Sequence, residues 1–107
     1  MNAFPYWQGA KIEDAPQVFR DAVAITKSKT KGKPFIVGET GWPTDGPNFE
    51  DATTSVGNLK SYWSTIGCEL RSQQVPNFWF SGCMFFFFFS LYKPHSYQKR
   101  GRLTHVI

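Results

Sequence analysis

Glu39 is the residue whose type and neighbours most clearly indicate chemistry. It comes directly after an apolar run at residues 35–38 and directly before a loop over residues 40–47 that is punctuated by glycine and proline. In an α/β barrel the active site lies at the carboxyl ends of the parallel strands, which is where this carboxylate would stand. The spacing alone also fits an ordinary acidic residue at a strand-to-loop junction.

Aromatic residues make up 18% of the chain, which fits either a large aromatic core or a sugar-binding surface. Trp42 follows Glu39 by three positions and offers a flat apolar face to the CH surface of a pyranose ring. Gly38 and Gly41 lie on either side of the carboxylate and permit close approach of backbone or substrate. On these residues alone, a sugar-binding role for this segment and an ordinary acidic residue at a strand-to-loop junction both stay open.

The rest of the chain alternates between strand-like and helical patterns. Apolar runs and helical spacing predict the order strand, helix, strand, helix, strand over residues 2–9, 13–31, 34–38, 56–70 and 75–81. Pro16 suits the first turn of the first helix, and Gly32 supplies its stop. This alternation predicts an α/β fold with parallel pairing of the strands.

Residues 35–43, FIVGETGWP, resemble the nucleophile segment of glycoside hydrolase family 17, in which the Glu of an E-[ST]-G-W-P motif attacks the anomeric carbon. Residues 2–8, NAFPYWQ, are similar to the preceding strand of fungal members, and residues 76–81, PNFWFS, to the last barrel strand. The resemblance implies the C-terminal part of a TIM (β/α)8 barrel, about three βα units, from a fungal cell-wall enzyme. The implied substrate is β-1,3-glucan, and the implied activity is that of an endo-β-1,3-glucanase or a glucanosyltransferase.

The resemblance also implies a retaining double displacement with Glu39 as the catalytic nucleophile. Tyr6, Trp7 and Trp42 are expected to form part of one sugar-binding wall. The family's acid/base Glu stands in an N-E motif that does not occur in this chain, and the other carboxylates are better explained as helix-terminal or solvated charges. Because a nucleophile without its proton donor expels a sugar leaving group poorly, we expect no measurable glucanase activity from the chain alone.

Charge and cysteine content argue against several other classes of partner. The net charge of +4 comes without a basic groove interleaved with aromatics, so no nucleic-acid partner is expected. Cys68 and Cys83 lack CxxC spacing and a histidine cluster, so no metal site, cofactor or disulfide framework is expected. Residues 1–7 lack the features of a signal peptide, so the extracellular or cell-wall location implied for the parent enzyme would be encoded elsewhere. The sequence indicates no oligomeric state.

Residues 82–107 depart from the family pattern and are treated as a segment distinct from the partial barrel at residues 1–81. The segment contains five consecutive phenylalanines, Phe85 to Phe89, and then a basic end. Its residues Cys83 to Phe85 can be encoded as TGT ATG TTT, which contains GTATGT, a sequence resembling a fungal 5′ splice site. We interpret the segment as a translated intron; transcripts that keep the reading frame through residue 107 would contradict this.

Two other classes of function stay open at this point. A membrane-anchored fragment could use the apolar stretch at residues 78–92, but this is shorter than the roughly 20 residues that span a bilayer. A non-catalytic carbohydrate-binding piece could use Tyr6, Trp7, Trp42 and Trp79 as stacking platforms. The alternating βαβ order argues against it, because binding modules of this size are usually β-sandwiches.

Overall fold

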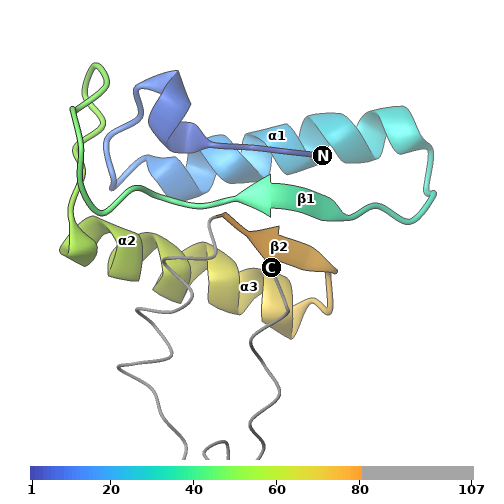
Figure 1. The fold of residues 1–107 in the computed structure, drawn as a ribbon. Helices are drawn as coiled ribbons and strands as arrows, with labels where there is room; N and C mark the ends of the chain where they lie inside the picture. Colours follow the sequence, from blue (N-terminus) through green and yellow to red (C-terminus); the bar gives the residue numbers. More distant parts are fainter. Residues whose placement is uncertain (81–107) are drawn as a thin grey trace, which may run out of the picture.

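A short parallel sheet with helices packed on one face makes up residues 1–80, the part of the chain that this computed structural model describes (Figure 1). The elements in chain order are the 3₁₀ turn η1 (Pro5–Gln8), α1 (Ala15–Thr30), β1 (Val37–Thr40), α2 (Val56–Tyr62), the π-helical turn η2 (Trp63–Gly67), α3 (Cys68–Ser72) and β2 (Asn77–Trp79).

Strand β1 is the middle one of three parallel segments. It pairs in parallel with β2, with Val37 opposite Asn77 and Thr40 opposite Trp79. On its other side, Asn2 forms an isolated parallel bridge with Glu39. The predicted α/β order and the predicted parallel pairing are thereby confirmed.

A bulge in β1 determines how its side chains are distributed. Between the two paired positions β1 has one residue more than β2, so the register shifts. Val37 and Thr40 would point to opposite faces of a regular strand, yet both are fully buried. Gly38 and Glu39 lie between them and are only half-buried. The bulge therefore allows the core to hold Val37 and Thr40 while Glu39 keeps access to solvent.

Helix α1 follows the sequence prediction closely. Its first turn contains a proline, and Lys27 and Lys29 occupy its last turn, where cations interact favourably with the helix dipole. Lys31, which was expected in the last turn, is instead the C-cap and has a left-handed backbone with φ of 49°. Phe19 anchors the helix, because its buried ring lies 6.4 Å from that of Tyr62 on α2.

The second predicted helix is present but is interrupted by the π turn η2. Ser55 caps its start by accepting a hydrogen bond from the backbone N–H of Asn58 at 2.9 Å. Its buried side chains at Tyr62, Ile66 and Leu70 recur every four residues, a longer spacing than the 3.6 residues of an α-helical turn. A wider π turn between them keeps all three on the face toward the core. Val56, the first residue of α2, lies outside this face and is 36% exposed.

The strand bounds differ from those that the sequence predicted. Strand β1 runs over Val37–Thr40 rather than 34–38, so Glu39 lies inside the strand instead of directly after it. Strand β2 covers Asn77–Trp79, so residues 75, 76 and 80 of the expected range lie outside it, and residue 81 is not among the described residues. Residues 2–9 contribute a single bridge and then the turn η1, in place of a longer strand end. Strand bounds depend on which backbone groups meet a partner in register, and side-chain patterns do not encode this.

Large apolar side chains are exposed on the face of the sheet away from the helices, because they alternate along the chain with side chains that face the core. Ile36, Phe78 and Phe80 are 50%, 65% and 54% exposed. The core lies on the opposite side, where Val37 belongs to one cluster with buried residues of both helical segments and Thr40 hydrogen-bonds to Tyr62.

Within residues 1–80, no helix combines the length and apolar character needed to cross a bilayer. The stretch at residues 78–92 that suggested a membrane anchor lies mostly outside the described residues. The whole of the segment 82–107 also lies outside them, so its interpretation as a translated intron stays a prediction.

Candidate functional site

Glu39 stands near the carboxyl end of the central strand and is held there by the segment at residues 1–3. Its carbonyl oxygen accepts a hydrogen bond from Ala3 N–H at 3.0 Å, and the preceding Gly38 N–H donates to the carbonyl of Met1 at 2.7 Å. The side-chain Oε2 of Glu39 accepts a hydrogen bond from Asn2 Nδ2 at 3.3 Å. The segment before η1 therefore positions both the backbone and the carboxylate of the candidate nucleophile.

Beneath Glu39, Thr40 connects the strand to the helical layer. Its hydroxyl hydrogen-bonds with the hydroxyl of Tyr62 at 3.0 Å, and both residues are fully buried. Burial raises the pKa of Tyr62 well above its usual range, although the hydrogen bond with Thr40 offsets part of that effect. Tyr62 therefore stays protonated at neutral pH and acts as a structural support rather than as an acid or base.

The three predicted sugar-stacking rings differ in how much of their surface is exposed to solvent. Trp7 is 62% exposed, whereas Tyr6 and Trp42 are 3% and 1% exposed. The rings of Tyr6 and Trp42 pack edge to face with centroids 5.5 Å apart, and Trp42 also contacts Tyr62. A stacking platform needs a ring face that a sugar can reach. The structure thus favours Trp7 over Tyr6 and Trp42 for this role.

Tyr6 and Trp42 instead hold the loop between β1 and α2 in place. The indole Nε1 of Trp42 donates to the carbonyl of Thr53 at 2.9 Å, and the Tyr6 hydroxyl donates to the carbonyl of Pro47. The loop is seen at the left in Figure 1, on the same side as η1 and the end of β1. Both rings therefore hold in place the loop at the edge of the site, here called the rim, and they do not line the site themselves.

Phe49 is a rim residue that the sequence analysis did not single out. It is 38% exposed, and its ring lies 5.6 Å from that of Trp7 in an edge-to-face arrangement. The loop brings the two side chains together although they lie far apart in the sequence. Because the two residues are far apart in the sequence, their contact could not be predicted from it. The one local signal was an aromatic residue, Phe49, close to the glycines and prolines of the loop.

A second carboxylate does not accompany Glu39 among the described residues. The other Asp and Glu side chains are exposed, except Glu69, and Asn2 is the only described side chain that hydrogen-bonds to the Glu39 carboxylate. Residues 1–80 also contain no group of three or more His, Cys, Asp or Glu side chains that could hold a metal ion. Residues 1–80 therefore place Glu39 without a second carboxylate hydrogen-bonded beside it.

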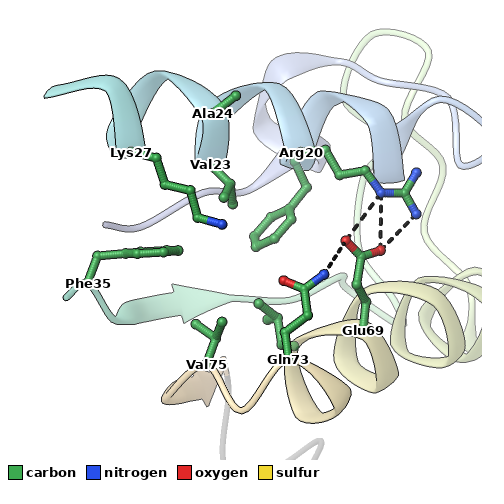
Figure 2. Close-up of a pocket in the computed structure, with 10 residues that line it drawn as sticks. Arg20, Val23, Ala24, Lys27, Phe35, Glu69, Gln73 and Val75 are labelled. Atoms are coloured by element: carbon green, nitrogen blue, oxygen red, sulfur yellow. Dashed lines mark hydrogen bonds and ion pairs between the residues drawn. The ribbon is translucent and has the colours of Figure 1, made fainter. Parts of the chain in front are cut away.

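A separate pocket of about 220 Å³ lies between α1 and α3, at the end of the sheet where the strands begin (Figure 2). Phe35 and Val75, which precede the two strands, form its floor, and the Nζ of Lys27 lies 5.4 Å from the Phe35 ring centroid. Arg20 on α1 and Glu69 on α3 close one side with an ion pair of 2.8 Å. The hydrogen bond to Glu69 raises the pKa of Arg20. Since Glu39 lies toward the other end of the strand, this pocket is not part of its site.

Comparison with known proteins shows that the chain is similar to fungal glycoside hydrolases. A model of the BtgE/BtgC glycoside hydrolase domain matches residues 1–88, so the match ends inside the segment 82–107. A glucan 1,3-beta-glucosidase of Saccharomyces cerevisiae is 46% identical over 81 residues, which cover 69% of this chain and 26% of the yeast protein. A probable glucan endo-1,3-beta-glucosidase of Aspergillus oryzae is 40% identical over 72 residues, with 64% of this chain and 16% of that protein covered.

Solved structures are similar as well. The crystal structure of a glycoside hydrolase family 17 beta-1,3-glucanosyltransferase from Rhizomucor miehei superimposes with a TM-score of 0.71 and 34% sequence identity. The similarity covers 76% of this chain and 30% of that one. An active-site mutant of the same enzyme, solved in complex with laminaritriose, is similar to the same extent, with 33% identity. The chain thus spans less than a third of the length of each of these relatives.

Proposed function

Because the chain belongs to the family of BtgE/BtgC glycoside hydrolase domains, we propose that it forms the C-terminal part of a retaining glycoside hydrolase acting on β-1,3-glucan, with Glu39 as the nucleophile. Its parallel segments and helices would be about three βα units of a (β/α)8 barrel. The parent enzyme would act outside the cell or in the cell wall.

The position of Glu39 is the observation that carries this proposal. The carboxylate is half-buried near the carboxyl end of the central parallel strand, and it accepts a hydrogen bond from Asn2. Catalytic groups of (β/α)8 enzymes occupy this end of the strands. In the reaction, a carboxylate oxygen of Glu39 would form a bond to the anomeric carbon while the glycosidic C–O bond breaks and its electron pair leaves with the departing oxygen.

The substrate class is supported by the relatives and by the rim of the site. The relatives are named for glucan with 1,3-beta linkages, and one of the similar structures is a complex with laminaritriose. Trp7 presents an exposed ring beside Phe49, which suits stacking against a pyranose. Tyr6 and Trp42 would contribute by holding this rim in position.

The proton donor of the proposed reaction would come from elsewhere in the parent enzyme. A retaining site needs its second carboxyl group about 5 to 5.5 Å from the nucleophile. None of the described carboxylates is hydrogen-bonded into the site around Glu39. We therefore expect that the purified chain does not hydrolyse laminarin, because the departing sugar is a poor leaving group that needs a proton from a general acid.

A substrate with a good leaving group tests the nucleophile without the acid. The purified 107-residue chain is incubated with a 2,4-dinitrophenyl 2-deoxy-2-fluoro-β-laminaribioside. Dinitrophenolate departs without a proton, and the fluorine slows hydrolysis of the ester, so a fluoroglycosyl adduct on Glu39 should accumulate. Intact-protein mass spectrometry measures its formation, and peptide mapping locates it.

Two variants make the experiment specific. Glu39→Gln should abolish the adduct, whereas Glu13→Gln, which alters an exposed carboxylate outside the site, should retain it. An adduct that persists in Glu39→Gln, or that maps to another residue, would contradict the proposed role. Absence of any adduct in the natural chain would also count against it.

A further inference from the structure

Asn2 is the side chain that contacts the Glu39 carboxylate. The two residues face each other in a parallel bridge, and Asn2 Nδ2 donates to Glu39 Oε2 at 3.3 Å. Side chains of bridged residues project to the same face of a sheet, so this contact follows from the backbone pairing. The hydrogen bonds of Ala3 and Gly38 across the same bridge hold the two backbones together.

The glycine at position 38 is a second observation that supports the position of the Asn2 side chain beside the Glu39 carboxylate. A Cβ built on Gly38 would lie 2.5 Å from Asn2 Oδ1, closer than such atoms can approach. The glycine before Glu39 therefore leaves the space that the Asn2 amide fills. Since the clash involves the end of a side chain and the nearest backbone atom is 3.6 Å away, an alanine at position 38 would displace the amide while leaving the strand in place.

We propose that Asn2 is a positioning residue for the nucleophile: its amide fixes Glu39 Oε2, so that Oε1, which has no hydrogen-bond donor among the described residues, faces the anomeric carbon. This inference rests on the proposed function of Glu39. A neutral amide suits the role, because it orients the carboxylate without the strong ion pairing that a Lys or Arg would impose. Holding a reacting oxygen in the productive direction is worth a large part of the rate in such reactions.

A first experiment detects the contact without any sugar. The side-chain amide signals of Asn2 are followed by ¹⁵N NMR in the full chain while the pH is varied across the carboxyl range. We expect these signals to shift with the ionisation of Glu39 and to lose that dependence in Glu39→Gln. Signals that do not change with pH, or that change equally in both proteins, would overturn the inference whatever the outcome of the glycosylation experiment.

A second experiment measures the consequence for the nucleophile. We expect the saturating rate of adduct formation with the dinitrophenyl fluoroglycoside to fall about 10-fold or more in Asn2→Ala and in Gly38→Ala, with similar half-saturating concentrations. The double variant should be scarcely slower than either single variant, because both remove the same contact. Gly57→Ala is the matched control, since the nearest atom to its new Cβ is Ser55 Oγ at 3.8 Å.

The outcomes separate the two proposals. No adduct in the natural chain counts against Glu39 as the nucleophile, and the NMR titration then decides the contact with Asn2. Normal rates in Asn2→Ala and Gly38→Ala, with an adduct in the natural chain, refute the positioning role alone. A loss that appears only in the half-saturating concentration would indicate that Asn2 contacts the sugar instead, and this would also refute it.

Discussion

The absence of a side chain at Gly41 allows β1, which contains the candidate nucleophile, to pair with β2. Phe80 N–H donates to the carbonyl of Thr40 at 2.7 Å, so the backbone after β2 runs directly against the residue after β1. That residue is Gly41, which is buried. A Cβ placed on it would lie 2.1 Å from the carbonyl oxygen of Phe80, which is backbone and cannot rotate away.

Gly41→Ala should therefore destabilise the chain by about 2 kcal/mol or more, since β1 and β2 must separate to admit the methyl group. Gly57→Ala makes only an ordinary van der Waals contact in a helix and should be neutral or stabilising by up to about 1 kcal/mol. Urea unfolding followed by tryptophan fluorescence measures both. Equal stability of the two variants would mean that the backbones do not approach this closely.

Glu39 could be singled out as a candidate from its own segment, whereas the residues that surround it could not. A carboxylate after an apolar run and before a Gly/Pro loop is a local pattern, and the sequence shows it directly. The contact with Asn2 depends on which segment pairs beside β1, and the exposed pair of Trp7 and Phe49 depends on how the loop folds. Trp42 has the type and spacing of a stacking residue, but packing against Tyr6 and Tyr62 buries it.

At the scale of elements, the helices were predictable because their signals are periodic and local. Pro16 and the lysines of the last turn mark α1, and a single cap at Ser55 starts α2. The π turn η2 arises from fitting side chains to the core, which no local preference specifies. The strands are three or four residues long, and their bounds depend on backbone partners far away in the chain.

The hydroxyl pair of Tyr62 and Thr40 is the polar link between the second helix and the sheet. Tyr62→Phe leaves the buried Thr40 hydroxyl without this partner, and we expect a loss of about 1 to 2 kcal/mol at pH 7. Thr40→Val should cost a similar amount. The double variant should lose less than the sum of the two, because the second substitution removes an already unpaired group. Additive losses in denaturant unfolding would mean that the two hydroxyls do not interact.

Because of the same hydroxyl pair, we expect the stability of the folded chain to depend on pH in the alkaline range. Burial raises the pKa of Tyr62 in the folded chain, so the folded state holds this proton more tightly than the unfolded chain, where tyrosine titrates near about pH 10. Its contribution is complete below that pH and is lost as the pH rises above it. The stability advantage of the natural chain over Tyr62→Phe should therefore shrink between about pH 9 and pH 11. A constant difference across this range would contradict the burial of the hydroxyl.

At the scale of the whole molecule, the described residues form one layer of helices on a sheet whose second face is open. The exposed side chains on or beside that face include Ile36, Phe78 and Phe80. The similar Rhizomucor chain is matched over only 30% of its length, so most of that domain has no counterpart in the matched region. A short parallel sheet with an apolar face and unpaired edges tends to associate with other sheets.

We therefore expect the purified chain to self-associate with increasing concentration, because pairing two open faces removes Ile36 and Phe78 from water. Ile36→Thr/Phe78→Thr should weaken the association at least several-fold, and threonine is β-branched and therefore remains suited to a strand. Ile25→Gln is the matched control: Ile25 is 57% exposed, but it lies on α1, away from the sheet. Sedimentation velocity over a range of concentrations measures all three chains. A natural chain that stays monomeric throughout, or a control that weakens association as much as the double variant, would show that the open face does not drive the contact.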